Sequence, residues 1–450
     1  MTRQWNPEPQ NETEANMLEA ADLALDIARK KGASMAEMSI GHGEGVCITV
    51  RQGEVETIEH NRDKSLGISV YFGHRNGTAS TTDFTPAAIE ASVQSACNIA
   101  KYTEQDPFNG LPDIEHLATE FPDLDLYHPW NPEIDEAIEL AALCESSALD
   151  ADKAISNTEG ASASSHTGTD LYANSLGFRG LSRSSRHSLS CSVIAGEGND
   201  MQRDYWYDSQ RDASQLMGAQ SVGAEAARRT TRRLGARKVK TGKYPVIYEA
   251  TIASSLLSHL ISAISGSSLY RKASFLLDHK GKKIFPEHIH IHEQPYLPKA
   301  AGSTSFDAEG VATRNKDIVD QGVLQSYVLN SYAARKLDMV TTGNAGGVHN
   351  LTIDSTAGDL NDLIASVDKG LVVSELIGFG VNNVTGDYSR GAFGFWVENG
   401  EIQYPVQEFT IAGNLSDMFN NMSAIGNDVD TRGNVRTGSI LVENMTVAGE

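Results

Sequence analysis

The sequence predicts an α+β fold with two regions, residues 1–240 and 241–450. Three observations support this prediction. Apolar residues alternate along several stretches, as in antiparallel strands, and separate amphipathic helices flank those stretches. The second half is rich in strand-like runs divided by glycines. No regular succession of strand and helix marks βαβ units, so antiparallel sheets fit better than a parallel one.

The first half begins with an amphipathic pattern over residues 13–31, which predicts a helix. Alternating apolar residues over 37–82 predict strands, with turns expected at Gln52-Gly53, at 61–63 and at Asn76-Gly77. Thr85 and Pro86 then form a typical helix start, and this helix should run to about residue 102.

Five prolines between residues 107 and 132 predict a linker or a long wrapping loop. A helix through about residue 149, a strand-rich stretch over 155–207 and a helix over 213–234 follow. The order helix, meander, helix therefore occurs twice before residue 240. This order suggests a structural duplication, although no residue-level repeat accompanies it.

A basic run near residue 240 marks the expected boundary between the two regions. It is either a docking patch for an acidic partner or nucleic acid, or a helix end followed by a solvated linker. We favour the second interpretation. The run comprises Arg228, Arg229, Arg232, Arg233, Arg237, Lys238, Lys240 and Lys243.

The second half opens with an apolar strand over 245–248 and a helix over 251–265. Beyond residue 271 it becomes glycine-rich and strand-like, with one further helix expected over 360–368 and clear strand signals at 371–373 and 440–442. The pattern predicts a strand-rich C-terminal region with few helices.

Composition restricts the functional classes. With 37 Lys and Arg against 59 Asp and Glu, the formal charge is −22, which disfavours nucleic acid and anionic membranes as partners. No apolar stretch is long enough to span a membrane, and the polar N-terminus lacks the apolar core of a signal peptide. A cytoplasmic location is expected, with the thiols reduced and buried. The four cysteines are Cys47, Cys97, Cys144 and Cys191.

Common catalytic signatures are absent from the chain, including a Walker A loop, GxGxxG, GxSxG and HExxH. The most visible candidate is the run 288–293, in which His288, His290 and His292 would share one face of a strand, followed by Glu293. Two such histidines could hold zinc with a third ligand, but positions four apart on a strand lie ~13 Å from each other. The alternative is an amphipathic strand with a polar outer face.

Two other segments stand out. His259 lies on an apolar helix, where a histidine is usually a packed residue of the core. Six glycines occur between Gly378 and Gly400, interleaved with Tyr388, Arg390 and Phe395. That combination would suit an extended peptide lying against a sheet, or simply turn glycines with core aromatics.

Several long motifs resemble the PmbA (TldE) proteins of the TldD/PmbA metallopeptidase family, and the resemblance extends over essentially the whole chain. The motifs lie at 157–160, 186–190, 268–278, 342–350, 385–406 and 425–428. The resemblance implies a subunit of a cytosolic heterodimeric metalloprotease that trims a microcin-precursor leader and degrades an antitoxin. An older description of the family is modulator of DNA gyrase. In that family the TldD subunit holds zinc with an HExxxH helix and a cysteine near its C-terminus.

This chain departs from the zinc-binding pattern. If His259 takes the first motif position, Leu260 replaces the glutamate and Ile264 the second histidine. The cysteine position falls near Arg432, and no cysteine follows Cys191. The resemblance therefore implies a non-catalytic subunit without a cofactor of its own, with zinc on a TldD-type partner. Tyr388, Arg390 and Phe395 would help to form the groove for an extended peptide.

Two alternatives remain open. The chain could be a metallopeptidase in its own right, with zinc at the 288–293 cluster. It could instead modulate a DNA enzyme such as gyrase through a protein contact, without proteolysis. A homodimer is conceivable when the TldD-type partner is absent.

Overall fold

The computed structural model describes residues 8–450, and the α+β prediction is confirmed: long antiparallel strands fill the first half, and two further sheets fill the second. In the first half the elements are α1 (Glu12–Lys30), β1 (Met35–Arg51), β2 (Glu54–Phe72), β3 (Arg75–Thr81), α2 (Pro86–Tyr102), α3 (Ile134–Ala151), β4 (Ile155–Asn174), β5 (Arg179–Ala195), β6 (Gln202–Gln210) and α4 (Ala219–Thr231).

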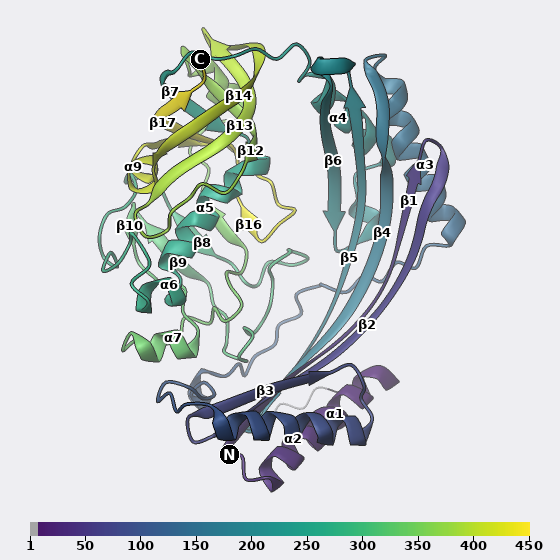
Figure 1. Ribbon diagram of the computed structural model, residues 1–450, viewed down its shortest axis with the longest axis vertical. Coiled ribbons are helices and arrows are strands. Elements are labelled where there is room, and N and C mark those ends of the chain that lie inside the picture. Colours follow the sequence, from purple (N-terminus) through teal and green to yellow (C-terminus); the bar gives the residue numbers. More distant parts are fainter. Residues whose placement is uncertain (1–7) are drawn as a thin grey trace.

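The first half forms one antiparallel sheet in the order β3-β2-β1-β4-β5-β6. Its strands are long and curved, with α1 and α2 against one end and α3 and α4 against the other (Figure 1). Two separate apolar cores lie under these helix pairs. The order helix, three strands, helix occurs twice, and the two copies meet where β1 pairs with β4.

Helix starts follow the capping signals that the sequence offers. The Asn11 side chain accepts a hydrogen bond from the backbone of α1, and Thr85 does the same for α2, with Pro86 in the first turn. The turn at Gln52-Gly53 is present, with both residues at positive φ.

Two predicted turns are wrong. Residues 61–63 lie inside β2, and Asn76-Gly77 lies inside β3, whose turn from β2 is at residues 73–74. The physical role of Gly77 is a close approach: a Cβ there would lie 2.1 Å from the Ala96 carbonyl oxygen of α2. This glycine lets the helix pack onto the strand, which is a common use of glycine within sheets.

The proline-rich segment 107–132 wraps along the second half. Its only regular element among the described residues is a short 3-10 turn, Ile114–His116. Arg335 donates to the backbone carbonyls of Phe108, Gly110 and Leu111. The segment is therefore a docked strap between the two copies of the helix-and-meander unit.

In the second half the elements are β7 (Gly242–Tyr248), α5 (Ala250–Ile264), α6 (Gly266–Tyr270), β8 (Ile291–Glu293), β9 (Lys316–Asp320), β10 (Val323–Leu324), α7 (Ser331–Lys336), β11 (Leu351–Ile353), α8 (Leu360–Ala365), β12 (Lys369–Ile377), β13 (Asp387–Glu398), β14 (Glu401–Asn414), α9 (Leu415–Asn420), β15 (Met422–Ile425), β16 (Val435–Arg436) and β17 (Ile440–Ala448).

These strands form two sheets around one large apolar core. One sheet has the order β10-β9-β8-β11-β16, and the other β14-β13-β12-β7-β17-β15, in which β14 also pairs with β17. Most pairs are antiparallel, as predicted, but β7–β12 and β11–β16 are parallel. The helix α5 packs against this core.

The basic run begins in the last turn of α4, as the favoured interpretation predicts, but its central part is not a solvated linker. Arg229 and Arg233 are buried, and both lie close to Asp204 of β6. Arg229 also pairs with Glu249 at the start of α5, and Arg233 with Glu375 of β12. These arginines join the first half to the second. Sequence reasoning missed this because their acidic partners are distant along the chain.

In the part of the chain that the structure describes, none of the helices has the length and apolar character needed to cross a membrane.

Candidate functional site

A cleft of about 580 Å³ lies between the first-half sheet and the second half. One wall is formed by residues 203–207 of β6, and the other by the helix α5 and by residues 374–376 of β12. Arg390 of β13 and Arg432 also line it. The cleft thus lies at the seam that the buried arginines hold together.

The helix α5 turns a polar face to this cleft. Ser254, Ser255, Ser258 and His259 line the cavity. The opposite face follows helical spacing and has no exposed surface; it consists of Ala253, Leu256, Leu257, Leu260, Ala263 and Ile264. The apolar stripe in the sequence therefore decides which side chains reach the cleft.

His259 is only partly enclosed, but its Nε2 atom is buried and has no hydrogen-bond partner among the described residues. Its ring packs edge-on against Tyr388, with centroids 5.9 Å apart. Burial lowers the pKa of His259, and the nearby Arg390 guanidinium lowers it further. The imidazole is therefore neutral at neutral pH, with one ring nitrogen unsatisfied.

Ser374 lies at an irregularity of β12. The register between β12 and β13 shifts between Val373 and Glu375, which leaves Ser374 outside the ladder. Its side chain is 4% exposed, and its hydroxyl has no hydrogen-bond partner in the described part of the chain. Such irregularities commonly re-aim a side chain next to a functional site.

Most arginines of the cleft are neutralised. Arg203 pairs with Glu159, and Arg229 and Arg233 pair with Asp204. The Arg432 guanidinium lies 2.7 Å from Asp430 and stacks over Trp206 and Tyr207, with 4.3 Å to each ring centroid.

Arg390 differs from the other arginines. Within residues 8–450 it has no carboxylate partner at ion-pair distance; its Nε donates to the Ile377 carbonyl, and its guanidinium lies 5.8 Å from the Phe379 ring centroid. Among the described residues, the cleft therefore has one arginine without a carboxylate partner, and it lines the same cavity as His259.

A second cavity of about 370 Å³ continues from the first. The two share Trp206, Arg229, Thr251 and Arg432 in their linings. The second cavity extends to residues 428–431, at the end of the 425–428 motif. The two cavities are therefore neighbours along the seam between the two halves.

The structure brings together some of the predicted site residues and separates others. His259, Arg390 and Arg432 line one cleft, although they come from three separate parts of the sequence. The remaining four lie in apolar packing at the cores: Leu260, Ile264, Tyr388 and Phe395. The Tyr388 ring packs edge-to-face against the His259 ring, and the Phe395 ring packs against the Arg232 guanidinium.

The donor set of this cleft does not fit zinc. It offers one imidazole, and its two carboxylates, Asp204 and Glu375, are already paired with arginines. The position where the resemblance places a cysteine ligand is occupied by the Arg432 guanidinium, which cannot donate electrons to a metal. No chemical step through zinc follows from these residues.

Sequence reasoning missed the β6 wall, in particular Tyr205, Trp206 and Tyr207. Three consecutive aromatic residues on a strand, flanked by charges, are a signal that could have indicated a binding wall. It also missed Ser374, because the irregularity in the strand register leaves no mark in the residue pattern.

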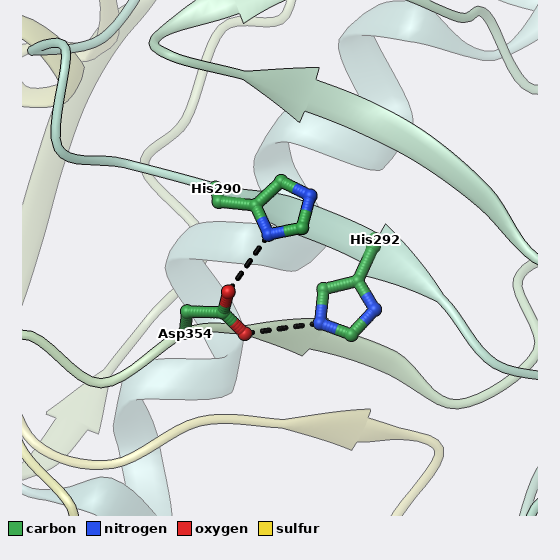
Figure 2. Close-up of side chains that lie close together, drawn as sticks. All are labelled: His290, His292 and Asp354. Atoms are coloured by element: carbon green, nitrogen blue, oxygen red, sulfur yellow. Dashed lines mark hydrogen bonds and ion pairs between the residues drawn. The ribbon is translucent and has the colours of Figure 1, made fainter.

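A second candidate lies on another face, in the sheet that contains β8. Asp354 accepts from His290 Nδ1 at 2.7 Å and from His292 Nε2 at 3.0 Å, as Figure 2 shows. The two imidazoles are stacked, with centroids 4.8 Å apart. The antiparallel pairing of Ile291 with Ile353 brings residue 354 next to residue 290.

This trio has different members from the metal-binding cluster predicted at residues 288–293. The potential ligand atoms of His290, His292 and Asp354 all lie within 4.8 Å of one another. His288 is exposed and not in the group. Glu293 lies on the buried face and pairs with Lys316. Asp317 accepts a hydrogen bond from the other ring nitrogen of His290, Nε2, at 3.0 Å, and a carboxylate in this position is typical of histidines that bind metals.

Comparisons with known proteins agree with the fold. Residues 36–100, 127–234 and 241–449 match domain 1, the central domain and the C-terminal domain of the PmbA/TldA metallopeptidases. The chain is 50% identical to the metalloprotease PmbA of Escherichia coli O157:H7, covering 96% of each chain. It is 46% identical to a PmbA homologue of Haemophilus influenzae, covering 97% of each.

Solved structures give the same result. A candidate modulator of DNA gyrase from Bacteroides thetaiotaomicron has a TM-score of 0.91 at 32% identity, covering 96% of this chain and 99% of that one. TldE from Thermococcus kodakarensis has the same fold, with a TM-score of 0.82 at 20% identity, over 96% of this chain and all of that one. A TldD homologue of Buchnera aphidicola is 24% identical over 56% of this chain and 58% of its own length. The chain belongs to the PmbA/TldD family of metallopeptidases.

Proposed function

We propose that this chain is the non-catalytic, TldE-type subunit of a two-subunit cytoplasmic peptidase. In this proposal it completes the peptide groove beside a TldD-type subunit that carries the zinc. The observation that carries the proposal is the cleft at α5. There His259 is the only imidazole, Leu260 and Ile264 point into the core, and a guanidinium takes the place of the cysteine.

The shape of the cleft supports an extended peptide as the ligand. Its two adjoining cavities run between a strand with aromatic side chains and a helix with a serine-rich face. Aromatic rings offer apolar contact to peptide side chains, and serine hydroxyls can bond to peptide backbone groups. Leader peptides of microcin precursors and antitoxin-like proteins are the substrates that the family resemblance suggests.

A surface next to the cleft supports the partner. Two large apolar side chains are exposed there, Ile377 at 55% beside the lining residue Leu376 and Phe379 at 96% against Arg390. Exposed apolar groups of this size commonly mark interaction sites. In the proposed complex the TldD-type subunit covers them, and a homodimer would cover them when that subunit is absent.

Coexpression with a TldD-type subunit tests the proposal. Each protein alone and the copurified pair are assayed for zinc content and for cleavage of an unfolded peptide. We expect zinc only on the partner and cleavage only by the pair. Chelator-sensitive cleavage by this chain alone would refute the non-catalytic assignment, and full activity of the partner without this chain would refute the shared groove.

A second candidate function is a metallopeptidase in its own right, which the trio of His290, His292 and Asp354 favours. Two imidazoles and a carboxylate leave an open position for water on zinc. Asp354 is exposed and the two imidazoles are partly exposed, so solvent can reach the trio. In this alternative, purified chain binds one equivalent of zinc and cleaves peptide alone, and His292→Ala loses both properties. His288→Ala is the matched control, because that histidine lies outside the trio.

A further inference from the structure

We propose that the cleft binds a peptide carboxylate between Arg390 and His259, with the Ser374 hydroxyl as a further donor. The proposal rests on the peptide-binding role proposed above and names the chemical group that is recognised. That group is a carboxylate, either the C-terminus of the peptide or an acidic side chain within it.

The charge of the cleft is the first argument. The whole chain carries −22, yet five arginines line the cleft against two acidic residues, Asp204 and Glu375. Four of the five arginines have carboxylate partners. Arg390 has none within residues 8–450, so one guanidinium remains for a ligand. A planar guanidinium fork matches a carboxylate, which it can bind through two parallel hydrogen bonds.

The unsatisfied polar atoms are the second argument. His259 Nε2 and Ser374 Oγ are both buried and without hydrogen-bond partners among the described residues, and both residues line the same cavity as Arg390. A buried polar atom without a partner carries a free-energy cost, because it has lost its hydrogen bonds to water. A carboxylate has enough lone pairs to accept from an imidazole N–H, a hydroxyl and a guanidinium together. Such a ligand removes the cost from both atoms.

The surroundings favour a peptide over a polyanion. Among the described residues that line the cleft, Arg390 alone among the arginines lacks a carboxylate partner, and a chain of strongly negative net charge repels a nucleic acid backbone. Ile252, Tyr205 and Leu376 give apolar surface beside the three donors. An amino-acid residue joined to the carboxylate would contact that surface. The pattern of a charged anchor with apolar neighbours is typical of peptide recognition.

The test measures binding to the full-length chain alone, by fluorescence polarisation, without zinc or partner. The probe is a short peptide of alanine, serine and tyrosine with an N-terminal fluorophore, prepared in three forms. One has a free C-terminus, one is amidated, and one is amidated with a central glutamate. We expect at least one carboxylate form to bind about tenfold more tightly than the neutral form, as one charge-assisted hydrogen bond would give. The form that binds identifies the source of the carboxylate.

Variants assign the effect to the cleft. Arg390→Ala should abolish the difference between charged and neutral peptides, and Arg390→Lys should keep part of it. His259→Leu should weaken the charged forms, whereas His259→Gln, which keeps a donor, should weaken them less. Arg237→Ala is the matched control, because Arg237 is exposed, lies outside the cavity and packs on Tyr404. Its binding should be unchanged.

Equal affinity for the three peptides would overturn the proposal. So would discrimination that survives in folded Arg390→Ala protein, with folding checked by circular dichroism. Failure of the two-subunit function looks different, because it appears as cleavage without this chain while carboxylate discrimination by the isolated chain persists.

Discussion

Glu293 is a buried carboxylate that holds three segments of the second half together. Its side chain has no exposed surface, pairs with Lys316 and accepts from the Asn344 amide at 2.9 Å and the His349 backbone N–H at 2.6 Å. Burial lowers the pKa of Lys316, and the Glu293 charge opposes that shift. The Glu293 carboxylate therefore helps to keep the Lys316 ammonium charged in its enclosed position.

Glu293→Ala should strongly destabilise the protein, because it leaves the Lys316 ammonium buried without a counter-ion. Breaking such a pair costs about 3–5 kcal/mol. Urea unfolding followed by tryptophan fluorescence measures the change in the free energy of unfolding. Glu287→Ala, at an exposed position of the same segment, should change it by less than about 0.5 kcal/mol. Equal stability of the two variants would contradict the structural role of Glu293.

Asp307 gives stability a specific pH dependence. Burial and the nearby Glu309 charge raise the pKa of this carboxyl from 3.8 to about 7, although backbone hydrogen bonds oppose the shift. Between these values the unfolded chain has released the proton while the folded chain retains it. A rise in pH therefore favours the unfolded state. The contribution of Asp307 to the free energy of unfolding falls between about pH 4 and about pH 7, by up to about 1.4 kcal/mol per pH unit.

Asp307→Asn removes the titrating group, so the variant should gain stability relative to the wild type as pH rises through that window. Urea unfolding of both proteins at several pH values checks the trend. Above about pH 7 the difference should become constant, since the carboxyl is ionised in both states. A difference that does not change with pH would show that Asp307 is ionised throughout.

At the residue scale, the sequence could predict parts of the candidate site only. His259 stood out as a lone histidine on an apolar helix, and Arg390 as a cation in a glycine-rich strand. Their proximity could not be predicted, because it depends on the packing of α5 against β12 and β13. Tyr388 and Phe395 were predicted to line a groove but lie in the apolar cores, for the same reason. An aromatic residue on a strand faces either a groove or the core, and only the register decides which.

At the element scale, glycines set how closely helices pack in the first half. A Cβ on Gly223 of α4 would lie 2.1 Å from the Cys144 carbonyl oxygen of α3. Gly77 permits the equivalent approach of α2 to β3. In both copies of the helix-and-meander unit, one glycine therefore fixes the position of a covering helix.

Gly223→Ala should force α3 and α4 apart and destabilise the protein by about 1–3 kcal/mol, as overpacking does. The better helix propensity of alanine offsets up to about 1 kcal/mol of this. Thermal and urea unfolding measure the net effect. Gly218→Ala is the matched control, because Gly218 precedes the same helix, has φ of −57° and has no atom within 4 Å of an added Cβ. A Gly223 variant as stable as this control would refute the close contact.

The elements that the sequence could predict are those with strong local signals. The helix start at Thr85 follows from its capping signal, and the long strands of the meanders follow from alternation. The short strands β8 to β11 carry few residues each, so their periodicity is too brief to read. The turn predicted at Asn76-Gly77 is wrong because the glycine has another role. It provides the small residue that a strand needs where a helix packs closely on it.

At the scale of the whole molecule, the cleft exists because the two halves meet along a charged seam. Asp204 lies on β6, whereas Glu249 and Glu375 belong to the second half. The arginines of α4 and the residues just after it lie between these carboxylates. The same seam that joins the halves forms the floor of the groove, so the geometry of the groove depends on this network.

Arg233→Ala should loosen this seam. Arg233 is 8% exposed, lies 3.5 Å from Asp204 and 2.6 Å from Glu375, and its guanidinium stacks 3.9 Å from the Phe393 ring centroid. Truncation removes the pair with the partly exposed Glu375 and leaves the buried Asp204 with Arg229 alone, so we expect a loss of about 1–3 kcal/mol. Because the contact joins the two halves, unfolding should become less cooperative, and limited proteolysis should cut near residues 234–241.

Arg228→Ala, which removes an exposed pair with Glu225 within α4, should leave both properties unchanged. If Arg233→Ala unfolds in one transition at the wild-type urea concentration, the seam is not what holds the halves together.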